Sequence, residues 1–514
     1  MLQTLTTPRG ETLSGTPWQV YPRPQMRRDS YINLNGEWDF AVSSEKPATF
    51  DMGITVPFCP ESRLSGIGRH FEEGAPLWYR RKFVLPGGFR RERVLLHIGA
   101  ADQTTEVFVN GQHLCRHEGG YASFSVDITE ALAEENELMI RCTDDLRDQA
   151  FPYGKQVRNR GGMWYTPVSG IWQTVWLESV PEAYIEKLNI ENHGASVTIS
   201  TVPPLEGTVS VEQLGQFPLE NGRVTIAPEN PRFWCPDTPY LYRFTLETAQ
   251  DRVESYFAIR SLEIKKVGEY PRLCLNGRPW FFHGLLDQGY WPEGLLTAPA
   301  PESYADDILA MKNLGFNTLR KHIKVEPEEF YYQCDRLGMI VWQDMVNGGT
   351  YNAPFMTWLP ALFPKFKLHT SDRIHPLFGR KNVHGREEFI RECKETVTAL
   401  KAFPCISTWV IFNEGWGQFD SKKLTALFRE LDDTRLIDSA SGWFDRRQGD
   451  FKSEHNYFAK QFVTPSDRAF VISEYGGYTC QVKGHTCSGK TYGYKICSSQ
   501  EEFQAAYHKL MSEE

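Results

Sequence analysis

Two stretches of the sequence decide the fold: WVIFNEGWGQFD at Trp409–Asp420 and AFVISEYGGY at Ala469–Tyr478. Each contains an apolar, β-branched run that ends on a glutamate, Glu414 in the first and Glu474 in the second. Such runs are typical of buried parallel strands, whose last residues point out where the sheet stops. In a barrel of parallel strands, catalytic side chains collect at that carboxyl-terminal rim. The two stretches therefore predict a parallel barrel with a pair of carboxylates at one end.

A pair of carboxylates at such a rim is the smallest set of catalytic groups that cleaves a glycosidic bond. In a retaining reaction the two carboxyl groups lie about 5–5.5 Å apart, one acting as general acid and the other as ionised nucleophile. The competing interpretation is structural, because any barrel carries carboxylates at strand ends and some of them form ion pairs. Position alone leaves the two interpretations even, and the residues around the glutamates favour the catalytic one.

After about residue 270 the sequence alternates strand and helix patterns, which predicts a parallel sheet. The expected strands are WFFHGLL, FNTLRKH, MIVWQD, ISTWVIF, RLIDSA, a weaker one near 454–457, and AFVISEY. The expected helices are ESYADDILAMKNLG, EPEEFYYQCDRLG, REEFIRECKETVTALKAF, SKKLTALFRELD and EEFQAAYHKLMSE. A closed barrel needs eight strands. Either one strand has no recognisable pattern or the chain lacks the last strand. We expect the second, a (β/α)8 TIM barrel that lacks its last strand and exposes two strand edges.

The sequence before residue 268 consists of short alternating runs broken by Gly, Pro, Asn and Asp. No helical pattern of any length intervenes up to about Val180, which predicts an all-β sandwich. The steps Asn35–Gly36 and Asn110–Gly111 are hairpin signals. A second, smaller β unit follows. We expect three domains, namely a jelly-roll-like β-sandwich at 1–180, an immunoglobulin-like β-sandwich at 181–267 and the barrel at 268–514.

Composition excludes several classes of function. The 514 residues exceed what one core absorbs, and the net charge of −9 without a long basic block argues against nucleic acid as a partner. No stretch approaches the length of a membrane span, and the N-terminus has no apolar signal segment. Eleven scattered cysteines without paired spacing predict reduced thiols, a cytoplasmic location and no zinc site.

The chain resembles glycoside hydrolase family two, the group of β-galactosidases, β-glucuronidases and β-mannosidases, over essentially its whole length. The resemblance rests on the expected domain order and on LWYRRKFVLP (Leu77–Pro86), VFVNG (Val107–Gly111), SGIWQTVWLE (Ser169–Glu178), LNGRPWFFHG (Leu275–Gly284) and LGFNTLRKH (Leu314–His322). In that family the glutamate after Asn at the end of strand four is the acid/base, and the glutamate ending strand seven is the nucleophile. The resemblance thus implies Glu414 as acid/base and Glu474 as nucleophile, with Asn413 bound to the sugar 2-hydroxyl.

Other residues near the expected strand ends are candidates for substrate binding. Arg320 is placed to clamp the nucleophile and lower its pKa, although a structural ion pair explains it nearly as well. Tyr457 resembles the family tyrosine whose hydroxyl contacts the nucleophile. Trp443 is a candidate stacking wall and His455 a candidate ligand, although a buried core residue is the commoner outcome for both types. Three residues that close strands one to three are candidates for binding sugar hydroxyls: Asp287, His322 and Asp344.

One departure from the family is Phe403-Pro404-Cys405, where many members have His-Pro before strand four, so no sugar-binding role is carried over there. We expect a retaining exo-β-glycosidase, first of the β-galactosidase type, with β-glucuronidase or β-mannosidase specificity as alternatives. The alternative from another class is a non-catalytic glycan-binding protein or inactive fragment, motivated by the missing strand. We expect a small-molecule carbohydrate or glycoside as partner, no cofactor and no required metal, and homo-oligomerisation stays open.

Overall fold

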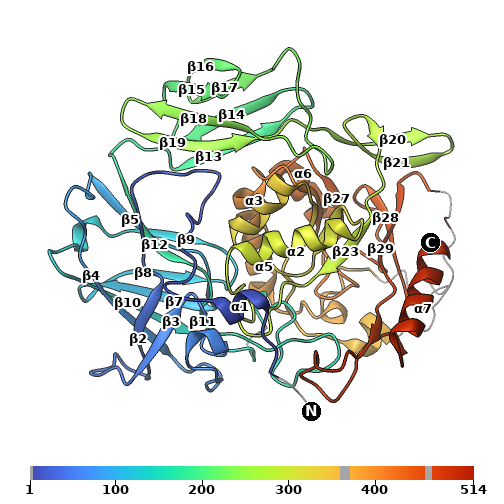
Figure 1. Ribbon diagram of the computed structural model, residues 1–514, viewed down its shortest axis with the longest axis horizontal. Coiled ribbons are helices and arrows are strands. Elements are labelled where there is room, and N and C mark those ends of the chain that lie inside the picture. Colours follow the sequence, from blue (N-terminus) through green and yellow to red (C-terminus); the bar gives the residue numbers. More distant parts are fainter. Residues whose placement is uncertain (1–3, 148, 359–370, 458–462, 464–465, 514) are drawn as a thin grey trace.

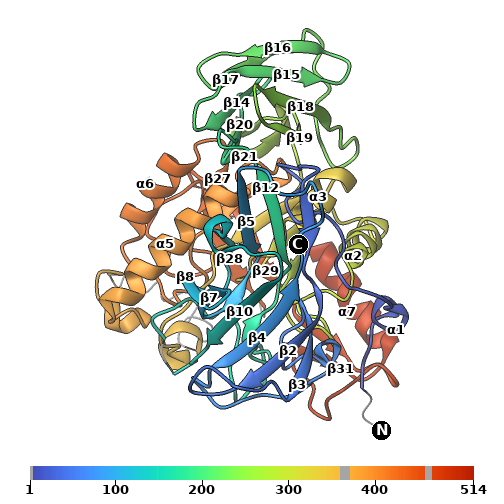
Figure 2. The ribbon, with the colours of Figure 1, turned by 90° about the vertical axis from the view of Figure 1, so that its left-hand side faces the viewer.

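The computed structural model of the chain describes residues 4–147, 149–358, 371–457, 463 and 466–513. Figure 1 shows antiparallel strands from the first part of the chain, a smaller β unit beside them, and strands alternating with helices in the second half. Figure 2 shows the smaller β unit at one end of the molecule. The unit of alternating strands and helices carries both glutamates.

Two antiparallel sheets form a sandwich in the N-terminal part of the chain. The first sheet has the order β1 (Tyr31–Asn33), β12 (Val175–Val180), β5 (Arg93–Ile98), β9 (Phe124–Asp127). The second has the order β3 (Met52–Val56), β2 (Gly36–Val42), β4 (Leu77–Phe83), β10 (Asn136–Thr143), β7 (Thr104–Val109), β8 (Gln112–Glu118). Buried and more exposed residues alternate along strands such as β7, so that one face of the sheet packs inward. Both sheets contribute to one apolar core, which includes Phe40, Tyr79, Leu96 and Ile140.

The two Asn-Gly steps differ in structure. In Asn110–Gly111 both residues have positive φ, 50° and 83°, and the step joins the paired strands β7 and β8 as a hairpin. The hairpin predicted at Asn35–Gly36 is wrong, because this step links β1 of one sheet to β2 of the other. The physical reason is the Asn35 side chain, which is buried and accepts from the backbone N–H of Val175 at 3.2 Å. Asn35 thereby fixes a corner between the sheets.

The smaller unit is a second sandwich of antiparallel sheets. One sheet has the order β13 (Lys187–Asn192), β14 (Val197–Val202), β17 (Arg223–Ile226). The other has the order β16 (Gly215–Leu219), β15 (Gly207–Val211), β18 (Tyr242–Thr248), β19 (Arg252–Phe257). Its separate core includes Ile199, Val209, Leu246 and Phe257. A sheet of β20 (Leu262–Val267), β21 (Tyr270–Leu275) and β22 (Arg278–Pro279) leads from it into the following unit.

The following unit has the parallel strands and the helices of a TIM-barrel domain. Five strands form one parallel sheet: β23 (Gly284–Asp287), β24 (Thr318–Lys321), β25 (Ile340–Asp344), β26 (Ile406–Val410), β27 (Leu436–Asp438). A second parallel pair contains β28 (Phe451–Asn456) and β29 (Ala469–Tyr475). The helices are α2 (Glu302–Asn313), α3 (Glu328–Leu337), α5 (Val383–Leu400), α6 (Ser421–Leu431) and α7 (Gln500–Glu513). Within the described residues, all seven predicted strands are present.

The units share an apolar core. Trp18 and Trp172, from the N-terminal part, and Trp234, from the second sandwich, pack in the same cluster as the residues of β25 and β26. The indole N–H of Trp18 donates to Ala298 O, and that of Trp234 donates to Asp335 O, both at 2.8 Å. Buried tryptophans with satisfied N–H groups are strong anchors, so the sandwiches are packed against the barrel rather than tethered to it.

The remaining elements are short. They are α1 (Pro8–Thr12), β6 (Ala101–Asp102), β11 (Gly170–Ile171), β30 (Tyr478–Cys480), β31 (Lys495–Cys497), and the helical turns Arg63–Ser65, Thr129–Ala131, Pro354–Trp358 and His375–Phe378. All eleven cysteines are free thiols. Among the described residues, every helix is too short or too polar to cross a membrane.

Candidate active site

Glu414 and Glu474 both lie where strands end. Glu474 is near the end of β29, and Glu414 follows just beyond β26. The Glu414 backbone is left-handed, with a φ of 53°, and Gly415 and Gly417 also have positive φ. The backbone N–H of Glu414 donates to Ser441 O at 2.9 Å. Because a left-handed backbone is uncommon for a residue with a side chain, this turn is one that the surrounding contacts hold in place.

The two carboxylates are neighbours. One oxygen of Glu414 and one of Glu474 lie within 4.8 Å of each other. The Tyr457 hydroxyl lies between them, 2.7 Å from Glu474 Oε2 and 3.1 Å from Glu414 Oε1. Burial and the two carboxylates raise the pKa of Tyr457, so its hydroxyl remains a donor at neutral pH. Two carboxylates this close can both reach one atom placed between them.

The surroundings of Glu474 favour its charged form. Burial by itself would raise the pKa of this carboxyl, but the positive fields of His455 and Arg320 outweigh burial and lower the pKa to about 2. Arg320 Nη1 donates to Glu474 Oε1 at 3.0 Å. Burial lowers the pKa of Arg320 less than the carboxylates of Asp344 and Glu474 raise it, so Arg320 keeps its charge. Glu474 is therefore ionised at neutral pH.

Arg320 connects three of the predicted site residues. Its Nε and Nη2 donate to the two Asp344 oxygens at 2.9 and 3.0 Å, and Nη2 also donates to Asn413 Oδ1 at 2.8 Å. Its side chain is 5% exposed. A guanidinium held this way presents its remaining donors in one fixed direction, which here is toward Glu474.

Two histidines complete the ring around the carboxylates. His455 Nδ1 lies 2.8 Å from Glu414 Oε1, and its Nε2 lies 3.0 Å from Ser441 Oγ. His322 Nδ1 lies 2.7 Å from Asp344 Oδ2. Burial, with the nearby cations, holds the pKa of His322 well below its usual range, so this ring is neutral. A neutral ring that donates from Nδ1 has Nε2 as an acceptor.

Two further predicted site residues, Trp443 and Asp287, contact other groups than the two glutamates and Arg320. The Trp443 indole donates to Met356 O at 2.6 Å and packs edge-on against His455, with ring centroids 5.5 Å apart. Asp287 is engaged by the ammonium of Lys321 at 2.8 Å and by the backbone N–H of Gly289 at 2.9 Å. Lys321 is buried and also binds Glu326 at 2.9 Å. Asp287 thus belongs to an ion-pair cluster separate from the two glutamates.

Sequence reasoning missed two residues at this site. The Tyr494 ring stacks on Tyr457, with centroids 4.0 Å apart and an angle of 21° between planes. Lys155, from the segment between β10 and β11, exerts a positive field on Glu474 and is itself influenced by Glu414. Neither has a local sequence signal of its own. The available signal for Lys155 was the long irregular stretch in which it lies, since such loops are often functional.

The same group of atoms meets the distance requirement for a metal site, because Glu414, His455 and Glu474 each offer a ligand atom within 4.8 Å of the others. Arg320 already binds Glu474 at 3.0 Å, and its fixed positive charge opposes a second cation there. The arrangement is better suited to carboxylate chemistry.

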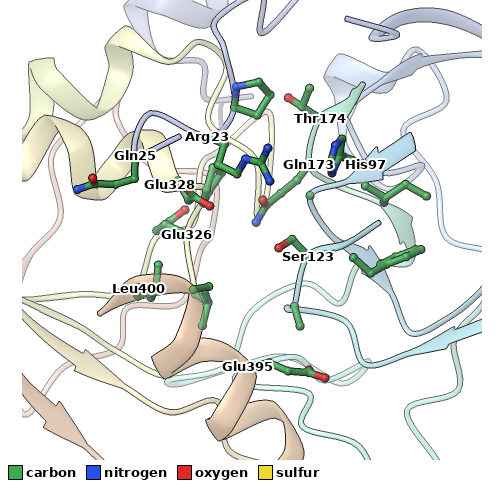
Figure 3. A pocket seen from close by; sticks show the side chains of 18 of the residues that line it. Arg23, Gln25, His97, Ser123, Gln173, Thr174, Glu326, Glu328, Glu395 and Leu400 are labelled. Carbon is green, nitrogen blue, oxygen red and sulfur yellow. The ribbon is translucent and has the colours of Figure 1, made fainter. Parts of the chain in front are cut away.

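A cavity of about 480 Å³ lies elsewhere, between the N-terminal sandwich and the helices α3 and α5. Figure 3 shows Arg23, His97, Gln173 and Glu328 among its lining side chains. None of the predicted site residues lines this cavity. The cavity is therefore distinct from the carboxylate pair.

Three family models match the chain in series. The glycosyl hydrolase 2 galactose-binding domain-like model matches residues 70–162, the glycosyl hydrolases family 2 model matches 182–260, and the family 2 TIM barrel domain model matches 269–512. Together they cover most of the chain in the order in which its units occur.

Curated relatives and solved structures are similar to this chain over most of its length. A β-galactosidase of Thermoanaerobacter pseudethanolicus is 22% identical over 90% of this chain, and a putative β-glucuronidase of Formosa agariphila is 23% identical over 94%. The chain spans 62% and 61% of the length of these two relatives. A β-glucuronidase structure from an uncultured Clostridium superposes with a TM-score of 0.72 at 19% identity, over 96% of this chain and 90% of that one. A β-galacturonidase of Eisenbergiella tayi bound to galacturonate superposes with a TM-score of 0.69 at 18% identity, over 96% and 88%.

Proposed function

Because the chain belongs to glycoside hydrolase family 2, we propose that it is a retaining exo-β-glycosidase, which removes terminal non-reducing β-linked sugars by double displacement. The observation that carries this proposal is the adjacent pair of carboxylates in unequal surroundings. Arg320 binds Glu474, whereas His455 binds Glu414. Paired carboxyl groups with different environments are what acid and nucleophile roles require.

Glu474 is the proposed nucleophile, because a pKa of about 2 leaves its carboxylate ionised. One of its oxygens bonds to the anomeric carbon while the bond from that carbon to the leaving oxygen breaks, and protonated Glu414 gives its proton to the leaving oxygen. Glu414 then removes a proton from water, and the water oxygen attacks the anomeric carbon and releases the Glu474 carboxylate. Two inversions retain the β configuration.

The neighbouring residues have proposed positioning and binding roles. Arg320 donates only, so it fixes Asn413 Oδ1 toward itself and leaves the Asn413 amide N–H groups for a sugar 2-hydroxyl. The Tyr457 hydroxyl holds the nucleophile oxygen in line. His322 Nε2 is the proposed acceptor for another sugar hydroxyl, with Asp344 fixing the ring. The proposed stacking wall is Trp443, and sugar binding by Asp287 stays a prediction.

The sugar is the finer part of the proposal. β-Galactosidase-type specificity remains the first candidate, in keeping with the Thermoanaerobacter relative. A β-linked uronic acid is the second, in keeping with relatives and solved structures that are named β-glucuronidase or β-galacturonidase. β-Mannosidase specificity has no counterpart in these names.

The test is turnover of nitrophenyl β-galactoside, glucuronide, galacturonide, mannoside and glucoside by the parent chain and by Glu414→Gln. We expect turnover of at least one substrate by the parent and a loss of more than 100-fold in the variant, because no other group protonates the leaving oxygen. Glu454→Gln is the control, since Glu454 in β28 pairs instead with Lys452. Hydrolysis of no sugar by the parent, or equal rates in Glu414→Gln and the parent, would contradict the proposal.

Azide separates the two roles. Azide added to Glu474→Gly should attack from the face that the nucleophile occupied and yield an α-glycosyl azide. Added to Glu414→Gly, it should intercept the glycosyl-enzyme and yield the β-anomer. The opposite anomers would show that the two roles have been assigned the wrong way round.

A further inference from the structure

Lys155 is a buried cation that the reaction above leaves without a partner. It is 7% exposed and belongs to the N-terminal part of the chain, in the segment between β10 and β11. Among the described residues its ammonium group makes neither a hydrogen bond nor an ion pair. Buried lysines are normally paired, because an uncompensated charge in the interior is costly. Its Nζ atom is not among the fully enclosed atoms without a hydrogen-bond partner, so the three N–H donors keep some accessible surface that a ligand can approach.

Backbone contacts hold Lys155 against the barrel. The N–H groups of Tyr153 and Gly154 donate to Asn347 O at 3.1 and 2.9 Å. Gly154 packs so closely that a Cβ there would lie 3.1 Å from Ile323 O and 2.8 Å from the Tyr121 hydroxyl. Ile323 follows β24, and Asn347 follows β25. The segment is thus pinned between the ends of two barrel strands, next to the catalytic rim.

Lys155 is within electrostatic reach of the catalytic groups but is bound to none of them. Burial is the largest influence and lowers its pKa, while the charges of Glu474 and Glu414 oppose this and that of Arg320 adds to it. Three of the four glutamate oxygens are already engaged by Arg320, His455 and Tyr457. The Lys155 charge therefore acts on both carboxylates, while its N–H donors are unused among the described residues.

Asn347 supplies a second observation beside Lys155. Its side chain is 1% exposed, and both amide atoms, Nδ2 and Oδ1, are buried without a hydrogen-bond partner among the described residues. A buried amide without partners is costly, and such groups usually bind a ligand or water. An unpaired ammonium group and an unpaired amide thus lie on two segments joined by hydrogen bonds at the same rim.

Resting on the proposed function, but taking its second candidate sugar in place of the first, we propose that Lys155 and Asn347 form a carboxylate-binding site that selects a β-linked uronic acid as the substrate. The ammonium group would form charge-assisted hydrogen bonds with the C5 carboxylate of the sugar, and the Asn347 Nδ2 would donate a further one. A neutral sugar has a hydroxymethyl group at this position and leaves the buried ammonium uncompensated. Sites built to hydrogen-bond one group reject analogues that lack it by large factors.

The test uses substrate pairs that differ only at C6: nitrophenyl β-galacturonide with β-galactoside, and β-glucuronide with β-glucoside. In at least one pair we expect the parent to prefer the uronide by at least 100-fold in kcat/KM. Lys155→Met should lower this ratio at least 100-fold, and Asn347→Ala at least 10-fold. The ratio is the readout, because a change in the field on Glu474 affects both substrates and cancels. Lys187→Met is the control, as Lys187 is exposed on β13 of the second sandwich.

Gly154→Ala is a variant that retains the side chains of both Lys155 and Asn347. The added Cβ displaces the segment, so the uronide preference should fall without a change of charge. A parent that prefers the neutral sugar in both pairs, or a ratio unchanged in Lys155→Met, would overturn the carboxylate site while leaving the glycosidase proposal intact.

If the parent turns over no substrate, calorimetric titration with free galacturonate and glucuronate tests whether the carboxylate site exists. Binding that Lys155→Met abolishes would support the site and contradict only the glycosidase proposal, and absence of binding would overturn the site as well.

Discussion

Glu414 and Glu474 are the same type of side chain in two different surroundings. Glu474 binds Arg320 at 3.0 Å and lies 3.8 Å from His455 Nε2, while Glu414 binds His455 Nδ1 at 2.8 Å. The Tyr457 hydroxyl touches both, yet it has one proton and makes its shorter contact with Glu474. The difference between acid and nucleophile at this site is thus set by the neighbours of each carboxylate.

At the residue scale, Tyr457→Phe should lower kcat/KM about 10- to 100-fold, the value of one hydrogen bond to a charged group. It should also move the acidic limb of the pH profile. The hydroxyl stabilises ionised Glu474, whose pKa is about 2, so its removal raises that pKa. Activity is lost as pH falls through this value, and the acidic limb therefore moves to higher pH. The pH dependence of kcat/KM measures this.

The matched control is Tyr270→Phe, which removes an exposed hydroxyl on β21. It should leave both the rate and the profile unchanged. An acidic limb at the same pH in Tyr457→Phe and the parent would show that the hydroxyl does not act on the nucleophile.

At the element scale, much of the fold was predictable because buried parallel strands carry continuous apolar runs. Six of the seven strands of the α/β unit overlap such runs, and two of them lead to Glu414 and Glu474, while β28 begins three residues before the weaker pattern near 454–457. Local motifs were less informative, as the Asn35–Gly36 corner shows, because a two-residue pattern does not reveal which strands it joins. The irregular stretch around Lys155 was visible in the sequence, but its place in the fold was not, since that depends on hydrogen bonds from Tyr153 and Gly154 to Asn347, far away in sequence.

Two helix ends offer a matched test of packing between elements. Gly338 ends α3 with a φ of 75°, and a Cβ there would lie 2.4 Å from Pro236 O of the second sandwich. Gly315, after α2, has a φ of 93° and nothing within 4 Å of such a Cβ. Gly315→Ala should cost about 1–2 kcal/mol for the left-handed backbone alone, and Gly338→Ala about 1–3 kcal/mol more for the clash. Scanning calorimetry measures both losses of stability. Equal losses in the two variants would show that Pro236 moves away from the added Cβ at no cost.

At the scale of the whole molecule, Asp335 joins three parts of the chain. This residue of α3 is 0% exposed, accepts from the Cys405 N–H at 2.6 Å, and accepts from the Tyr256 hydroxyl of β19 at 2.8 Å. Burial raises its pKa to about 7, more than these hydrogen bonds lower it. The folded state therefore binds a proton that the unfolded state releases between about pH 4 and 7.

The sign of the effect follows from this raised pKa. The stability that Asp335 contributes is fully present below the ordinary carboxyl pKa and is lost as pH rises through about 7. Asp335→Asn should therefore reduce the loss of unfolding free energy between pH 6 and 8 by about 1 kcal/mol. Unfolding at several pH values measures this, with exposed Asp51→Asn as the control. A pH dependence as steep as that of the parent would contradict the raised pKa.

The segment pinned by Asn347 has a consequence for how such an enzyme changes over evolutionary time. On the proposed arrangement, the bond-breaking groups are inherited with the barrel, whereas the charge that chooses the sugar is inherited with the N-terminal sandwich. Replacing that one loop of the sandwich would change the substrate specificity and leave the two catalytic glutamates unchanged. Enzymes that share the barrel can then diverge in the sugars that they hydrolyse.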